Sequence, residues 1–397
     1  MRSQSRWFLP LMAATGVTMS LTAPLEVLFA REISPSSVYI GAFMLSAAVG
    51  VIAVDVFGSR FVPGLDARTA LIAGLAMFGL ACIGMGLASN ATLMMASRIL
   101  QGLGGGLVLG AGLQAAVRIV RPGAALSSHT GTPPEDLDRS LGRFNAAFLF
   151  GGAVGAPAGL LVAGIIEGRI GFQIALVTTG ALALAVAGTL AVALPRMAIA
   201  SGMPPPRIGL PRFARAPGSR PAIVLAMSGE FLRAGVLFTA LPLAGAARGY
   251  STLMITGAIA LMCGAEIIVL AMAHRVIARV GVFTLLIKAF ALGVTCATLT
   301  AAVPSPTMYL LVSAVFGISL AGATAGLPVL IVAQVGESSA GLAKFRVSAG
   351  IGQLAGMVGC AVLAAQVGIA TLFVLIAFVL LASTQLARSV AHRMAAT

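Results

Sequence analysis

The chain has 397 residues, of which 59% are hydrophobic and only 9% are charged. A soluble domain carries about 25% charged residues, so this composition excludes a soluble globular protein and favours one whose surface faces lipid. The net charge of +14 comes almost entirely from Arg residues between apolar runs, which argues against a contiguous nucleic-acid-binding face.

Apolar runs long enough to cross a bilayer recur along the chain. A spanning helix needs about 20 mainly apolar residues, and short hydrophilic breaks separate most of the runs. We therefore predict an all-α polytopic membrane protein with twelve transmembrane helices. The predicted spans are 7–30, 36–57, 69–89, 91–114, 144–166, 171–194, 221–245, 251–273, 281–303, 308–333, 346–366 and 368–387.

The positive charges alternate from one side of these spans to the other. Nineteen of the 25 Lys and Arg residues fall on the side that holds the N-terminus, three fall in the opposite loops and three fall within spans. Because cytoplasmic loops carry the excess of Lys and Arg, both termini are expected in the cytoplasm. The preference for Arg over Lys suggests a bacterial protein, integral to the inner (cytoplasmic) membrane.

The predicted domains are a six-helix bundle over 1–194, a cytoplasmic linker over 195–220 and a second six-helix bundle over 221–397. The linker has six Pro, five Arg and no acidic residue. This composition predicts a stiff solvated linker or, alternatively, a contact with anionic membrane lipid.

Matching features in the two halves predict an internal repeat. The letters TAPL at 22–25 correspond to TALPL at 239–243, and Gly residues stand 7 and 11 positions after both Phe144 and Phe345. Transporters built from two such repeats bind substrate near the membrane midplane, between the halves.

Features of other protein classes are missing from the sequence. The four Cys residues lie in apolar runs, the three His residues are far apart, and no GxxxxGK[ST] phosphate-binding loop occurs. We therefore expect no metal, no cofactor and no enzymatic activity.

Two motifs resemble those of a known family. Residues 98–106 read RILQGLGGG, similar to the RxxQGxG signature of the major facilitator superfamily. Residues 151–159 read GGAVGAPAG, which resembles the GxxxGP motif of the superfamily's twelve-span drug/proton antiporter branch, with Pro157 one position late. The resemblance implies two six-helix repeats. It also assigns helix packing in the antiporter motif to Gly151, Gly155, Pro157 and Gly159.

The loop between spans 2 and 3 departs from the superfamily pattern GxxxDRxGRR. Pro63 and Gly64 stand where the Asp-Arg pair is expected, so the charge latch of the family is incomplete. Asp55, Arg68 and Arg279 are the remaining latch candidates.

Charged residues within the spans are functional candidates, because a charge at the bilayer centre costs at least about 2.5–3.5 kcal/mol on insertion scales. In the family, spans 1 and 4 line the cavity, so Glu26 and Arg98 could meet. Our hypothesis is that proton uptake by Glu26 weakens its hold on Arg98 and couples proton entry to substrate release. The alternatives are a static pair or a Glu26 exposed at the outer surface.

Three further charges occupy spans 7 and 8. Glu230 and Arg233 are three residues apart, on one face of an α-helix, which predicts a self-neutralising pair or a cavity acid for a cationic substrate or second proton. Glu266 has no partner nearby in the sequence, so it is expected to be neutral, either as a proton carrier or as a protonated packing residue. Lys288 is expected to extend towards the headgroups.

Gln101 and Gln114 lie on span 4 and could hydrogen-bond to a substrate, although bonding between helices is the commoner role.

The sequence as a whole predicts a secondary transporter, a proton-coupled exporter of a lipophilic drug-like or metabolite substrate by alternating access. The alternatives are an uptake symporter or facilitator for a small metabolite, sugar or lipid precursor, and a non-transporting scaffold or receptor. The expected partners are a small-molecule substrate, protons and membrane lipids, with no nucleic acid, and the chain is expected to be a monomer.

Overall fold

The computed structural model describes residues 7–34, 36–61, 66–120, 134–166, 168–194, 219–302, 305–335 and 339–395, and every regular element within them is a helix. The elements are α1 (Phe8–Ser20), α2 (Ala23–Ile33), α3 (Ser37–Phe61), α4 (Ala67–Gly86), α5 (Ala91–Val120), α6 (Pro134–Ile165), α7 (Arg169–Ala193), α8 (Ser219–Phe231), η2 (Leu232–Ala240), α9 (Leu241–Ala247), α10 (Thr252–Val280), α11 (Val282–Ala302), α12 (Pro306–Val335), α13 (Ser339–Val367) and α14 (Ile369–Ala395).

The predicted fold class is confirmed, because each predicted span corresponds to one helix or to one run of helices. Span 1 is α1 followed by α2, and span 7 is α8, η2 and α9. In the described residues, eleven helical segments are long and apolar enough to cross a membrane. The twelfth, α3, has 25 residues, or about 38 Å at 1.5 Å per residue, and its apolar part is Val38–Val51.

Contacts between Cα atoms divide the chain into two compact units. The first unit comprises Met1–Leu25 and Leu45–Ile208, and the second comprises Glu26–Met44 and Gly209–Thr397. The second unit therefore includes a segment that crosses from the end of span 1 into span 2. The domain limits predicted from the sequence stay a prediction, since most of the linker lies outside the described residues.

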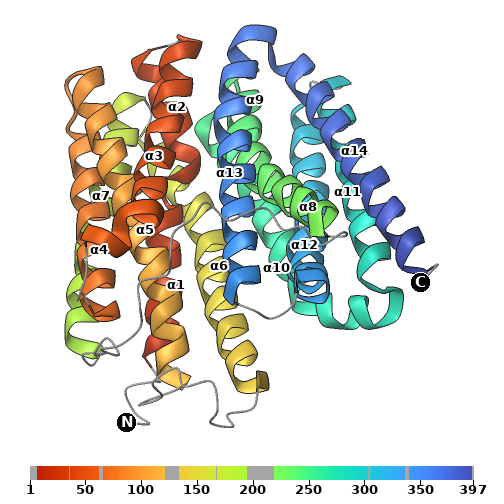
Figure 1. Cartoon of the computed structure of the whole chain (residues 1–397). Coiled ribbons are helices and arrows are strands. Elements are labelled where there is room, and N and C mark those ends of the chain that lie inside the picture. Colours follow the sequence, from red (N-terminus) through yellow and green to blue (C-terminus); the bar gives the residue numbers. More distant parts are fainter. Residues whose placement is uncertain are drawn as a thin grey trace. The chain divides into compact units, whose positions relative to one another are not determined.

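The first unit is built around close helix pairs. Helix α4 packs against both α5 and α7, and α1 packs against α6 (Figure 1). Several hydroxyl groups are satisfied within their own helices, as when Thr15 Oγ1 donates to the carbonyl of Leu11 at 2.8 Å. Such bonds are needed in lipid, which offers polar groups no partner.

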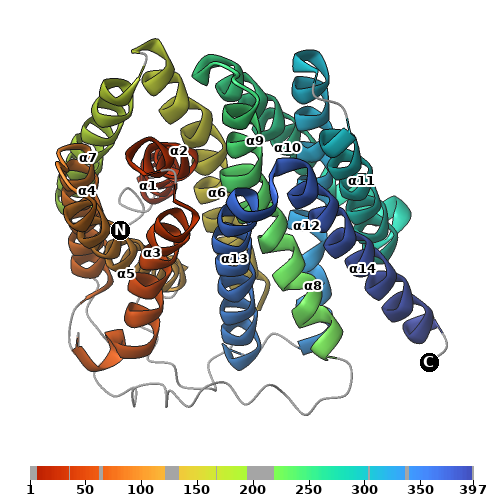
Figure 2. The same cartoon turned by 90° about the horizontal axis from the view of Figure 1, so that it is seen from above.

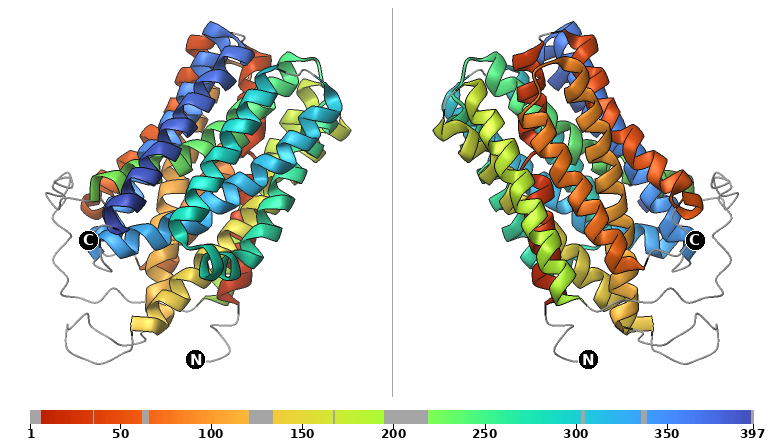
Figure 3. Two further views of the ribbon diagram at one scale, coloured as in Figure 1. Left: turned by 90° about the vertical axis from the view of Figure 1, so that its right-hand side faces the viewer. Right: turned by 90° about the vertical axis from the view of Figure 1, so that its left-hand side faces the viewer.

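In the second unit, α11 packs between α12 and α14 (Figure 3), and α8 runs along α13 (Figure 2). Side chains join neighbouring helices. The hydroxyl of Tyr309 on α12 donates to the carbonyl of Leu241 on α9 at 2.9 Å, and Ser383 on α14 bonds to Ser228 on α8 at 2.9 Å. These bonds join span 7 to spans 10 and 12.

Span 7 is interrupted by a π-helical stretch, η2, of nine residues. Its hydroxyl bond shows the wider turn, since Thr239 Oγ1 donates to the carbonyl of Ala234, five residues earlier, at 3.1 Å. A Cβ atom on Gly235 would lie 3.0 Å from the Cα atom of Gly356 on α13, so η2 rests almost directly on the α13 backbone. π-Helical turns are rare and often occur at functional sites.

Large apolar side chains are also exposed on the surface of the chain. Val192 is 90% exposed, Val38 is 75% exposed and Ile165 is 69% exposed. Surfaces of this kind are unfavourable in water but suit contact with lipid.

Candidate functional site

A polar cluster joins three helices of the second unit. Arg233 on η2 forms an ion pair with Glu266 on α10, through Nη2 and Oε1. The same Nη2 atom donates to Thr324 Oγ1 on α12 at 2.8 Å, and the Thr324 hydroxyl lies 3.4 Å from Glu266 Oε1. One arginine therefore ties together spans 7, 8 and 10.

This ion pair is buried and uses only one carboxylate oxygen. The Glu266 side chain is 3% exposed and the Arg233 side chain is 15% exposed. No described residue hydrogen-bonds to the buried Oε2 atom of Glu266. A buried acceptor without a donor costs free energy, so Oε2 is a place where a ligand's N–H or O–H group would be stabilised.

Glu266 has no partner nearby in the sequence, but the expectation of a lone, neutral acid is wrong because Glu266 forms an ion pair with Arg233. Its partner Arg233 lies 33 residues earlier, on another helix, and the packing of span 7 near span 8 brings the two together. A search of the sequence for partners three or four positions away cannot find a pair of this kind.

The predicted pairing of Glu230 with Arg233 is also wrong. Within the described residues Arg233 has its ion pair with Glu266, and Glu230, near the end of α8, makes no direct hydrogen bond or ion pair. The α-helical i, i+3 rule does not hold here because η2 begins at Leu232 and has a wider turn. Glu230 nevertheless feels the charges of both Arg233 and Glu266, and its side chain is only partly buried.

A second polar cluster lies in the first unit, around Gln101 on α5. Arg98 Nη1 donates to Gln101 Oε1. Gln101 Nε2 lies 3.1 Å from Thr22 Oγ1, in the break between α1 and α2, and 3.5 Å from Cys82 Sγ on α4. Because all four residues are buried, Gln101 bonds helices to one another, and its substrate-binding role stays a prediction.

Glu26 lies in the first turn of α2 and is 3% exposed, as is Arg98. The alternative of an exposed Glu26 is therefore wrong. Its pairing with Arg98 and its role in proton coupling stay predictions. The side chain of Gln114 lies outside the described residues.

The glycines of the antiporter-like motif place α6 directly on α1. A Cβ atom on Gly151, Gly155 or Gly159 would collide with a backbone carbonyl oxygen of α1 or of the residue that follows it, namely Ala13, Val17 and Leu21 in turn. We call this contact the glycine seam. Pro157 lies inside α6, which continues through it to Ile165.

The latch candidates are spread over different parts of the chain. Arg68 Nη2 donates to the carbonyl of Ala191 and so joins α4 to α7. Arg279 is exposed in the last turn of α10, and the side chain of Asp55 lies outside the described residues. The latch role of all three stays a prediction.

Lys288, which was expected to reach the headgroups, is exposed.

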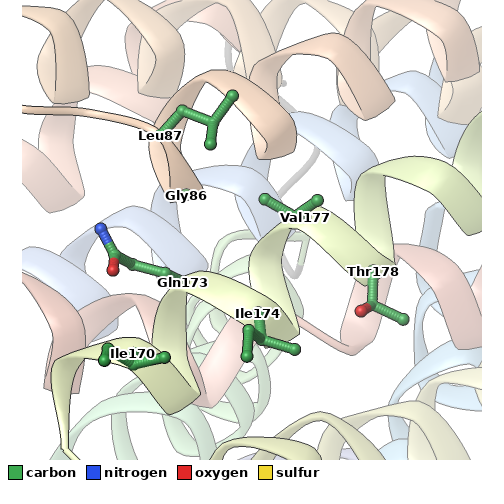
Figure 4. Close-up of a pocket in the computed structure, with 7 residues that line it drawn as sticks. All are labelled: Gly86, Leu87, Ile170, Gln173, Ile174, Val177 and Thr178. Carbon is green, nitrogen blue, oxygen red and sulfur yellow. The ribbon is translucent and has the colours of Figure 1, made fainter.

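A shallow groove of about 340 Å³ opens where α4 ends and α7 begins (Figure 4). It contains no candidate residue and no charge, and its rim residues Leu87 and Ile170 are 67% and 62% exposed. Such a lining suits contact with lipid. The groove residues are Gly86, Leu87, Ile170, Gln173, Ile174, Val177 and Thr178.

Comparison with known proteins identifies the family. The model of the Major Facilitator Superfamily matches residues 7–343. The chain belongs to the Major Facilitator Superfamily. The chain is therefore an integral membrane protein of a transporter family rather than of an enzyme family.

Solved structures share the superfamily fold at low identity. The nucleoside transporter NupG aligns with 12% identity and a TM-score of 0.66, over 96% of this chain and 98% of that chain. A point mutant of NupG aligns with 13% identity and a TM-score of 0.67, over 96% and 99% of the two chains. No curated protein sequence matches the chain. The membership is thus established for the superfamily, whereas the drug/proton antiporter branch is not.

Proposed function

We propose that the chain is a secondary active transporter that takes up a small polar metabolite together with protons, by alternating access. Membership of the superfamily supports the transport activity. Two solved structures with a similar fold, NupG and its point mutant, are named as nucleoside transporters, which makes a nucleoside the first substrate to test.

The observation that carries the polar substrate is the buried Oε2 atom of Glu266, which has no donor among the described residues. A lipophilic molecule would leave this oxygen without a hydrogen-bond donor, and the free-energy cost of burying the oxygen would remain. A hydroxyl or amino group on the substrate would donate to it. The site therefore favours a substrate with hydrogen-bond donors over the lipophilic substrate first expected.

Export was predicted from the antiporter-like motif of span 5. In the structure its glycines allow two backbones to touch, which is a general way of packing membrane helices and sets no direction of transport. Uptake is therefore the main proposal, and export of a lipophilic compound is the alternative that the experiment must separate from it.

The test is transport into proteoliposomes that contain the purified chain. We expect labelled uridine, or another polar metabolite from a small panel, to accumulate when the outside is acidic, and a protonophore to abolish the accumulation. Glu266→Gln should lose uptake, whereas Glu32→Gln, which changes an exposed acid at the end of α2, should retain it. Movement of a lipophilic dye with no movement of any polar metabolite would contradict the proposal.

A further inference from the structure

Glu230 lies three residues before Arg233 and interacts electrostatically with Arg233 and Glu266, so the cluster together with Glu230 contains two carboxylates and one guanidinium. Arg233 stays charged because guanidinium groups are not deprotonated in proteins. Glu266 neutralises the charge of Arg233 in a direct ion pair. The charge of Glu230 is then in excess, so the cluster is neutral only when it holds one additional proton.

Glu230 is surrounded by few other charges. Arg233 on η2 and Glu266 on α10 are the described groups that act on it electrostatically. Helix α12, which packs against α8, has no charged residue in its sequence. The charged residues of α13 and α14 lie at 344–346 and 388–393, where the side chains of 344–346 are outside the described residues. An ionised Glu230 in a membrane helix would thus leave one uncompensated negative charge, which lipid disfavours.

Exposure separates the two acids of the cluster. Glu266 is 2% exposed and held by two donors, whereas Glu230 is partly exposed and has no direct bond to a described residue. Protonation of Glu230 therefore leaves the ion pair between Arg233 and Glu266 intact. Protonation of Glu266 would instead leave Arg233 as a buried charge without its partner.

From this arrangement we propose that Glu230 is the residue that carries the transported proton, while Glu266 stays ionised and holds Arg233. The proposal rests on the proton-coupled transport proposed above. A proton from water on one side of the membrane binds the Glu230 carboxylate to give the carboxylic acid, and the acid later releases it to water on the other side. The number of protons is conserved, and no other bond changes.

Arg233 connects this proton to the substrate. When Glu230 is protonated, Arg233 is attracted to Glu266 alone, and the site keeps one oriented carboxylate with its second oxygen open to a donor. When Glu230 is ionised, it competes with Glu266 for Arg233. Substrate binding at Glu266 and proton binding at Glu230 are therefore linked through one shared cation.

The experiment compares two modes of transport in proteoliposomes that contain the wild type or Glu230→Gln. Exchange of labelled for unlabelled substrate needs no net proton movement, and we expect the variant to retain it, because the amide resembles the protonated acid. Accumulation driven by an acidic exterior should be lost. Glu32→Gln is the matched control and should retain both modes. Continued pH-driven accumulation by Glu230→Gln, or accumulation by the wild type that follows a sodium gradient, would overturn the proposal.

A second measurement needs only the wild type. A hydrophobic carbodiimide modifies protonated carboxyl groups within membranes, and mass spectrometry locates the modified residue. We expect modification at Glu230, decreasing as the pH rises; modification at Glu266 instead, or at neither acid, would overturn the assignment. If the wild type moves no substrate in any mode, the proposed function fails, and that result is distinct from loss of coupling in Glu230→Gln alone.

Discussion

The ion pair between Arg233 and Glu266 shows how a membrane helix can tolerate charged side chains. The two charges neutralise each other, and Thr324 adds a hydrogen bond from a third helix. Breaking a buried pair by removing one partner costs about 3–5 kcal/mol, whereas replacing both partners with apolar residues is often neutral.

The pair can be tested by comparing single and double substitutions. We expect Glu266→Leu alone to destabilise the protein by about 3–5 kcal/mol because Arg233 is left without its counter-ion. The double variant Arg233→Met with Glu266→Leu should recover most of that loss but not transport. Thermal unfolding in detergent measures the effect, with Glu32→Gln as the control. Equal destabilisation of the single and double variants would show that packing, rather than charge, dominates at this position.

The sequence predicted which residues are functional candidates better than it predicted their partners. Because charges are costly in lipid, the presence of Glu230, Arg233 and Glu266 within apolar spans is enough to mark them as candidates. The contact of Arg233 with Glu266 depends on how distant helices pack, and on a π-helical stretch with no sequence signal that we recognised. The hydrogen bonds of Gln101 to α4 and to the break in span 1 are non-local in the same way.

Among the elements, α1 and α6 illustrate how glycine positions set the distance between helices. In the glycine seam, glycines four residues apart on α6 face carbonyl oxygens four residues apart on the chain of span 1. Apolar segregation does not drive helices together in lipid, so close backbone contact supplies much of the attraction. The seam requires residues without a Cβ atom at all three positions.

The glycine seam predicts a sharp difference between two glycines of the first unit. Gly155→Val should destabilise the protein by about 1–3 kcal/mol or more, since overpacking is costly and the new Cβ would meet the backbone of Val17. Gly188→Val on α7 should have little effect, because no atom lies within 4 Å of a Cβ there. Melting temperatures of the purified variants make the comparison. Similar melting temperatures for the two variants would argue against a tight seam.

Hydropathy predicted the spans well because each must be apolar over about 20 residues to satisfy the bilayer. Breaks within the spans were harder to predict. Span 1 divides into α1 and α2, and span 7 into α8, η2 and α9, although both spans remain apolar enough overall to cross a membrane. Backbone geometry inside an apolar run leaves hydropathy unchanged, so it cannot be read from that signal.

At the scale of the whole molecule, both ends of the chain are expected in the cytoplasm, because most Lys and Arg residues lie on the same side of the spans as the N-terminus. The four native cysteines are buried, so a cysteine introduced at the surface can be labelled with little background. Two exposed positions serve this purpose, His392 near the end of α14 and Ser251 before α10.

Labelling with a membrane-impermeant maleimide tests the orientation. In intact spheroplasts, Ser251→Cys should react, whereas His392→Cys should react only after the membrane is permeabilised. The wild type should remain unlabelled in both cases. The reverse pattern would show that the chain is inserted with its termini outside.

The π-helical stretch also bears on the comparison of the two repeats. In span 1 a threonine and a proline, Thr22 and Pro24, are two positions apart, while their counterparts in span 7, Thr239 and Pro242, are three apart. One residue corresponds to about 100° of rotation around an α-helix. The motif in span 7 therefore has one residue more between its threonine and its proline than the motif in span 1. Suppose that span 1 is matched to span 7 by counting back from the proline rather than from the threonine. Every earlier residue is then shifted by one position, and the expected direction of the Arg233 side chain changes by about a quarter of a helical turn.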